Sequence, residues 1–290
     1  MPIRTLHPLL AAKARDELNE EPRRIEESLR VLKEWIAVQP HLKARTDDQW
    51  LLAFLRGCKY NLEKTKTKLD LYYTLRTTAP EVYCIKYSEP KIYRIIESGA
   101  VLVMPKIKDP AEPRVILIRP GWYNPSDCTF MEVMAVMLFQ LQISYMEDDN
   151  LTVAGMVNVV DLKGLSLSHV RQISIFEIRK LIAVTQDAAA TRMKGVHIIN
   201  TMYLFETLFN LVKNFLNDKI RKRFQIHNKD YEAFFKCVPR EVLPEEYGGD
   251  GGTTRDIIDY WKRKFSQYEG WLREDFEYKS DESKRPRRLR

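Results

Sequence analysis

The sequence has no C-x-x-C pair among its four cysteines, Cys58, Cys84, Cys128 and Cys237. Zinc fingers and ribbons use closely spaced cysteine pairs, and disulfide-stapled domains are dense in cysteine. The spacing therefore argues against zinc and against a disulfide framework, and we expect four free, buried thiols.

Long hydrophobic runs are also missing. The longest, residues 131–143, is interrupted by Glu132, Gln140 and Gln142, so it falls short of the roughly 18–20 apolar residues that a membrane span requires. Segment 1–17 has only a brief apolar patch followed by charges, which does not match a secretory signal. We therefore expect a cytoplasmic protein whose association with membranes is transient and peripheral.

Common enzyme signatures are absent as well. There is no G-x-x-x-x-G-K-[ST], no G-x-G-x-x-G after a strand, no G-x-S-x-G and no H-E-x-x-H. A triad of His169, Asp161 and either Ser166 or Ser168 can be drawn, but its spacing matches no nucleophile elbow. We expect these to be ordinary loop residues, and we expect no catalytic residue, no metal and no enzymatic activity.

Positive charge is concentrated at one end of the chain. The net charge is +7, and the terminal segment 284–290 supplies five of those charges, leaving +2 for the rest. A nearly balanced body argues against nucleic acid as a partner. A short basic end is usually mobile and solvated, with contact to acidic lipid or a nuclear address as alternatives.

With 290 residues and 44% hydrophobic content, the chain can build a substantial core. Residues 22–80 carry helical periodicity and cap signals, which predict one helix near 25–36, a second over 47–57 and a third from Asn61. The sequence therefore predicts an all-helical N-terminal region.

The pattern then changes to short β-branched runs that alternate with helical stretches. This alternation predicts βαβ units and a mostly parallel sheet. The expected strands are 99–104, 114–119, 152–160 and 194–200. The expected helices are 127–145, 168–187 and an amphipathic helix after the glycine-rich stretch 243–252.

Segment 202–223 joins a strongly apolar helical pattern to a basic cluster that includes Lys219 and Arg223. Its apolar residues would cover well over half of a helix, so the helix must bury two flanks. A core could cover one flank and an apolar ligand or a bilayer the other, while the basic residues attract anionic head groups. A fully buried core helix that ends in a solvated basic turn is the alternative.

Four segments in this order resemble the CRAL-TRIO family of lipid-transfer proteins: 47–65, 155–169, 192–216 and 243–249. Together they extend the resemblance over approximately residues 25–270. It implies an α/β fold in which an N-terminal all-helical bundle packs on a domain whose mostly parallel sheet floors an apolar pocket closed by a gate helix. The implied division is 1–85 for the helical region, 86–275 for the lipid-binding domain and 276–290 for a basic, disordered tail.

The resemblance also implies where a ligand would lie. By position, residues 202–216 match the gate helix. Asn158 would be the polar member of the pocket, either as a handle for the ligand or through a structural hydrogen bond to neighbouring backbone. The implied pocket residues are Phe130, Met134, Met137, Leu138, Leu141, Met156, Asn158, Val160, Leu165, Val196, Ile198, Tyr203, Phe205, Leu208, Phe209 and Val212.

A basic patch beside the gate binds phosphatidylinositol bisphosphate in one branch of the family. Cys58 stands where that patch has a further basic residue, with Lys59 adjacent, and Thr191 stands where phosphatidylinositol-transfer members have a glutamate. Loss of one polar partner costs about 1–3 kcal/mol, which favours a compact ligand over a whole phosphatidylinositol. The residues implied for phosphoinositide or membrane contact are Arg192, Lys194, Lys213, Lys219 and Arg223.

The resemblance therefore implies a monomeric carrier that binds one small hydrophobic ligand and transfers it at anionic membranes. Tocopherols, retinoids, carotenoids and related isoprenoids are the expected cargo, and no cofactor is expected beyond that bound lipid. A phosphatidylinositol or phosphoinositide transfer or presenting protein is the alternative on the same fold. A lipid hydrolase and a signalling scaffold without cargo are alternatives of other classes.

Overall fold

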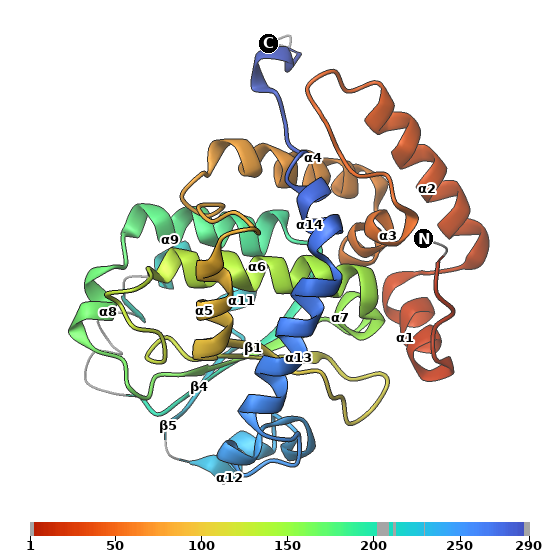
Figure 1. Cartoon of the computed structure of the whole chain (residues 1–290). Helices are drawn as coiled ribbons and strands as arrows, with labels where there is room; N and C mark the ends of the chain where they lie inside the picture. Colours follow the sequence, from red (N-terminus) through yellow and green to blue (C-terminus); the bar gives the residue numbers. More distant parts are fainter. Residues whose placement is uncertain (1–2, 202–208, 211–212, 229, 287–290) are drawn as a thin grey trace.

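The computed structural model describes residues 3–201, 209–210, 213–228 and 230–286. Its centre is a sheet with the order β1-β2-β3-β4-β5, in which β1 pairs antiparallel with β2 and the other pairs are parallel (Figure 1). The predicted mixed α/β fold with a mostly parallel sheet is confirmed. The strands are β1 Val101–Val103, β2 Arg114–Ile118, β3 Met156–Asp161, β4 Met193–Ile199 and β5 Phe224–Asn228.

The N-terminal region is helical, as predicted. Asn61 begins one of its helices by accepting a hydrogen bond from the Lys64 backbone N–H at 2.9 Å, which pairs one of the free amides of the first turn. Trp50 is fully buried and donates from Nε1 to the Tyr73 hydroxyl at 3.0 Å. The helices are α1 Pro8–Leu18, α2 Pro22–Ala37, α3 Asp48–Gly57 and α4 Leu62–Thr78.

The remaining helices surround the sheet. In Figure 1, α6 and α9 lie on one side of the sheet and α12 lies on the other. In the part of the chain that the structure describes, no helix has both the length and the apolar character to cross a membrane. These helices are α5 Pro90–Ser98, α6 Phe130–Glu147, α7 Asp149–Val153, α8 Leu167–Arg171, α9 Ile175–Ile182, α11 Asp218–Arg221, α12 Tyr231–Phe235, α13 Thr254–Gln267 and α14 Glu269–Asp275. Shorter turns are a π-helical turn at Ala183–Ala188 and 3-10 turns at Lys213–Phe215, Arg240–Val242, Glu245–Tyr247 and Glu282–Lys284.

The strand expected over 152–160 starts four residues late. Residues Asp149–Val153 form α7 instead, because the Asp148 carboxylate accepts a hydrogen bond from the Leu151 N–H at 3.2 Å and caps that helix. Gly155 then turns the chain with φ +91°, a backbone conformation that glycine adopts without strain. Strand β5 was not among the expected strands.

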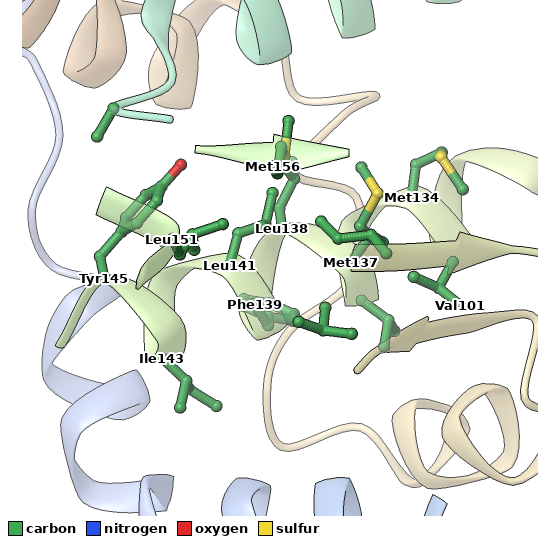
Figure 2. Close-up of a cluster of buried hydrophobic side chains, with 14 of the residues drawn as sticks. Val101, Met134, Met137, Leu138, Phe139, Leu141, Ile143, Tyr145, Leu151 and Met156 are labelled. Atoms are coloured by element: carbon green, nitrogen blue, oxygen red, sulfur yellow. The ribbon is translucent and has the colours of Figure 1, made fainter. Parts of the chain in front are cut away.

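Helix α6 covers one face of the sheet with apolar side chains. Because side chains alternate along a strand, Met156, Asn158 and Val160 share that face. In Figure 2, Leu138 and Leu141 lie on the side of α6 toward Met156, whereas Phe139 and Ile143 point the other way. The same helix thus packs on the sheet and on the layer behind it.

Residues 276–286 were expected to belong to a disordered tail, but they pack against the N-terminal region instead. Ser280 forms an isolated antiparallel bridge with Leu42, and its carbonyl accepts a hydrogen bond from Thr77 Oγ1 at 2.7 Å. Arg285 Nη1 contacts Asp70 Oδ2 at 2.8 Å. These contacts hold the segment against the N-terminal helices, and residues 287–290 lie outside the described residues.

Candidate functional site

The expected pocket residues from α6 and the sheet gather on one sheet face, but in two buried clusters. The first contains the residues from α6 together with Met156. The second lies toward the carboxyl ends of β3 and β4, and half-buried Met193 packs against both. The members of the first cluster expected to line the pocket are Met134, Met137, Leu138, Leu141 and Met156, with Phe130 packed against it. Those of the second are Leu165, Val196 and Ile198, with Val160 packed against it.

Asn158 lies on β3 between these clusters, flanked by Ile116 of β2 and Val196 of β4. Its side-chain Oδ1 is buried and has no hydrogen-bond partner among the residues that the structure describes. A structural hydrogen bond to neighbouring backbone, the alternative at this position, is therefore not made by Oδ1 within the described part. An unpaired buried carbonyl costs about 1–3 kcal/mol, so this atom is suited to accept a hydrogen bond from a ligand.

Most of the expected gate helix lies outside the described residues, including Tyr203, Phe205, Leu208 and Val212. Phe209 is half-buried, and its ring centroid lies 5.7 Å from that of Phe224 on β5. Nothing is described of the Lys213 side chain, although its backbone begins a 3-10 turn. Those parts of the pocket and gate hypotheses therefore stay predictions.

Three of the expected basic residues, Arg192, Lys219 and Arg223, line one pocket of about 410 Å³. Five segments build it: the end of α3, α4, the turn after α9, the start of β4, and α11 with the residues that lead into β5. Asn217 caps α11 by accepting a hydrogen bond from the Ile220 N–H at 2.9 Å, which positions Lys219 in the first turn. The lining residues are Gly57, Lys64, Thr67, Lys68, Leu71, Gln186, Asp187, Thr191, Arg192, Met193, Asn217, Lys219, Ile220 and Arg223.

The pocket is strongly electropositive. Among the described lining residues, Asp187 is the one acidic residue beside five lysines and arginines. Arg223 lowers the pKa of the Lys219 ammonium, burial adds to the shift, and Lys59, Lys64 and Arg192 add further repulsion. Such crowding of like charge is favourable only where an anion offsets it.

Several of these cations form no salt bridge with a described residue. Within the described ranges, no salt bridge is formed by Lys64, Lys219 or Arg223. Lys68 differs, because its ammonium donates hydrogen bonds to the carbonyls of Asp187 at 2.6 Å and Ala189 at 3.0 Å. These bonds connect α4 to the turn after α9.

Lys194 does not line this pocket, although it was grouped with these residues. Its ammonium lies 3.2 Å from Glu17 Oε2 of α1. Arg192 takes part in both places, since it donates to the Val153 carbonyl and lies 3.7 Å from Glu17 while also lining the pocket. Burial lowers the pKa of Arg192, although the guanidinium remains charged.

Sequence reasoning missed Lys64 and Lys68. They lie four residues apart in α4, a spacing that places both side chains on one helix face, and this was the available signal. Cys58 is buried and contributes no charge, while the charge of the adjacent Lys59 reaches Lys219. Thr191 lines the pocket and its Oγ1 lies 2.7 Å from the Tyr145 hydroxyl of α6.

The triad drawn from Asp161, Ser166 and His169 does not assemble. His169 Nδ1 lies 2.7 Å from Ser166 Oγ in the capping box of α8, and its Nε2 lies 2.9 Å from the Tyr123 carbonyl. Asp161 instead accepts hydrogen bonds from the Tyr247 hydroxyl and the Lys163 N–H. It belongs to a separate pocket of about 730 Å³ at the carboxyl ends of β3 and β4, also lined by Trp122, Asn200 and Tyr231.

Comparison with known proteins now decides the family. The model of the CRAL/TRIO domain matches residues 98–249, which include the whole sheet and the basic pocket's β4 wall. The chain belongs to the CRAL-TRIO family. A second model, of the Pinta-like UBA domain, matches residues 21–87 of the helical region.

Relatives of this CRAL-TRIO protein span most of its length. Human alpha-tocopherol transfer protein-like is 32% identical over 245 residues, covering 84% of this chain and 70% of its own. Clavesin-1 of Xenopus laevis is 27% identical and covers 84% and 74%, and human clavesin-2 is 26% identical and covers 91% and 82%. The crystal structure of Sfh5 is 14% identical with a TM-score of 0.47, covering 87% of this chain and 90% of that one.

Proposed function

We propose that this CRAL-TRIO protein is a carrier that encloses one small hydrophobic ligand and transfers it at anionic, phosphoinositide-containing membranes. The ligand is a tocopherol, retinoid, carotenoid or related isoprenoid. The protein acts in the cytoplasm as a monomer, performs no covalent chemistry and needs no cofactor beyond its cargo. Residues 1–85 form the helical region and 86–275 the lipid-binding domain.

The observation that carries the membrane part is the convergence of Lys64, Arg192, Lys219 and Arg223 on one pocket, where Asp187 is the one acidic residue of the described lining. Phosphate groups are bound by clustered arginines and lysines because each charge-assisted hydrogen bond is stronger than a neutral one. A volume of about 410 Å³ admits a phosphorylated head group but leaves the acyl chains outside. This pocket is therefore suited to a lipid that stays in the membrane.

Exposed apolar side chains on the helix that leads to the pocket support a surface that lies on a membrane. Ile175 and Phe176 begin α9 and expose 49% and 62% of their surface. The turn that follows α9 supplies Gln186 and Asp187 to the basic pocket. The Lys180 ammonium lies 4.5 Å from the centroid of the Phe176 ring, and exposed apolar residues beside a cation are typical of surfaces that lie on a bilayer.

The cargo would be held by apolar burial on the sheet face that carries Asn158. Burial contributes about 25 cal/mol for each Å² removed from water, so a compact isoprenoid that hides a few hundred Å² gains several kcal/mol. Asn158 Oδ1 would accept a hydrogen bond from a hydroxyl group at the polar end of the ligand. The name of the human relative, alpha-tocopherol transfer protein-like, supports this ligand class.

Release then requires that the membrane bind the open form more tightly than the closed form. Occupation of the basic pocket by a phosphoinositide head group would supply that difference. The residues that bind the membrane are thus separate from the residues that bind cargo, which makes the two functions experimentally separable.

The test is ligand transfer between vesicles with and without phosphatidylinositol bisphosphate. The Lys219→Gln/Arg223→Gln double variant should slow transfer to phosphoinositide vesicles by about tenfold or more, with unchanged affinity for the ligand in solution. Arg221→Gln/Lys222→Gln is the matched control, because it removes the same charge from the same segment, 219–223, at exposed residues outside the pocket. Equal rates for both double variants would contradict the proposal.

A further inference from the structure

Two histidines and a cysteine meet on the face of the sheet opposite α6. His197 Nδ1 of β4 lies 2.9 Å from His227 Nε2 of β5. The Cys237 thiol follows α12, and its sulfur and the two ring nitrogens all lie within 4.8 Å of one another. The spacing in sequence, 30 and 10 residues, hides the cluster, since zinc motifs are recognised by short spacings.

The backbone explains why the three side chains converge. His197 pairs across the sheet with Gln225, and His227, two residues later in β5, has the same side-chain direction. The backbone then turns: the Asp230 N–H donates to the His227 carbonyl at 2.8 Å, and α12 begins at Tyr231. At its other end, the Cys237 N–H donates to the Phe234 carbonyl at 2.9 Å, which brings the thiol back over the two rings.

The surroundings are those of a partly enclosed site. His197 is 4% exposed, His227 is partly buried and Cys237 is exposed, so the cluster is reached from the cysteine side. Phe234 is fully buried, and its ring centroid lies 5.6 Å from that of His227 and 6.5 Å from that of His197. The cluster therefore has an apolar wall on one side and an opening on the other.

We propose that His197, His227 and Cys237 bind one zinc ion. Two imidazole nitrogens and one thiolate form a common ligand set for zinc. Two nitrogens bound to one tetrahedral zinc at about 2.0 Å lie about 3.3 Å apart, so the present 2.9 Å needs only a small opening. The fourth position goes to water or to the side-chain oxygen of Gln225, which now accepts the thiol hydrogen of Cys237 at 3.3 Å.

A zinc ion here would join the edge strand β5 to β4 and to the end of α12. Edge strands have hydrogen-bonding partners on one side alone, and β5 is the last strand of the described sheet. Because zinc binds the folded chain and not the separated ligands, it should raise the stability of this edge. This inference is independent of the lipid that the protein carries.

The experiment titrates the metal-stripped full chain with Co²⁺, which reports thiolate ligation through a charge-transfer band in the near ultraviolet, and then displaces it with Zn²⁺. We expect one equivalent of Co²⁺ with that band, and a zinc-dependent rise in the unfolding temperature. Cys237→Ser should abolish the band and weaken zinc binding by about tenfold or more. His197, in the sheet, is left unchanged because its replacement could unfold the chain.

Cys84→Ser is the matched control, because Cys84 is also an exposed free thiol and is not part of the cluster. It should retain the cobalt band, the zinc affinity and the rise in unfolding temperature. His227→Gln should lose the one-to-one complex while remaining folded by circular dichroism. A wild-type chain without a thiolate band, or a Cys237→Ser variant that keeps it, would overturn the proposal and leave the histidines as a hydrogen-bonded pair.

Discussion

Arg56 and Glu20 form a buried, two-point ion pair. Arg56 Nε lies 2.8 Å from Glu20 Oε2 and Nη2 lies 2.9 Å from Oε1. Arg56 Nη1 also lies 2.8 Å from Asp149 Oδ1 of α7. One guanidinium thus connects the chain before α2, helix α3 and the edge of the lipid-binding domain, so the helical region and the sheet share a polar network.

Arg56→Met should destabilise the protein by about 3–5 kcal/mol, because it leaves the buried Glu20 without its arginine counter-charge, whereas Asp149 keeps Arg4 at 2.9 Å. Urea unfolding followed by tryptophan fluorescence measures this loss. The exposed pair of Arg30 and Glu34, with side-chain exposures of 61% and 62%, provides the control, and Arg30→Met should cost less than about 1 kcal/mol. Similar losses for the two variants would show that burial does not set the strength of the Arg56 network.

Asn158→Leu should separate stability from ligand binding. Removing Oδ1, which has no partner among the described residues, should leave the empty protein as stable or more stable, by up to about 2 kcal/mol. The same change should weaken binding of a hydroxyl-bearing isoprenoid about tenfold. Tocopherol and its methyl ether, which lacks the donor, should be compared by fluorescence titration.

The methyl ether is the control for lost space in the pocket. Its affinity should be the same for the wild type and Asn158→Leu, because neither complex contains the hydrogen bond. If Asn158→Leu weakens both ligands equally, the leucine acts by steric exclusion and the assignment of Asn158 as a polar handle is wrong.

The ion pair between Glu17 of α1 and Lys194 of β4 should lose its contribution to stability at acid pH. The hydrogen bond from Lys13 lowers the pKa of Glu17 to about 2, burial opposes the shift, and Lys194 adds to it. Because the folded-state pKa lies below the ordinary value of 4.5, the contribution is complete above about pH 4.5 and is lost as the pH falls toward 2. Glu17→Gln removes it at every pH.

The urea midpoints of the wild type and Glu17→Gln should therefore differ at pH 6 and converge between pH 4.5 and 2. Glu26→Gln controls for the loss of a surface carboxylate, since Glu26 is exposed. A difference between the wild type and Glu17→Gln that stays constant down to pH 2.5 would contradict the assigned ion pair.

The sequence predicts the elements that have strong local signals. Helices α2, α3 and α4 follow from periodicity and from the caps at Asp47 and Asn61. Strand β5, by contrast, reads FQIHN, and its short polar alternation carries little signal because one edge is unpaired. The late start of β3, after Gly155, depends on one capping aspartate, Asp148, which composition does not reveal.

The site residues likewise divide into those that the sequence indicates and those that only the fold brings together. Arg192, Lys219 and Arg223 were placed together by resemblance, and the structure brings them to one pocket. Lys64 of α4, more than 100 residues earlier in the chain, lines the same pocket. Lys194 does not, because its ammonium pairs with Glu17. The cluster of His197, His227 and Cys237 depends on strand register and on α12, so no short motif could indicate it.

The most direct test of the carrier hypothesis is native mass spectrometry of the protein purified from its own source, followed by organic extraction of the bound molecule. The hypothesis predicts one neutral isoprenoid per chain, which the protein would release when vesicles that contain phosphatidylinositol bisphosphate are added. A chain that retains no hydrophobic molecule, or that retains a phosphatidylinositol in a one-to-one complex, would contradict it.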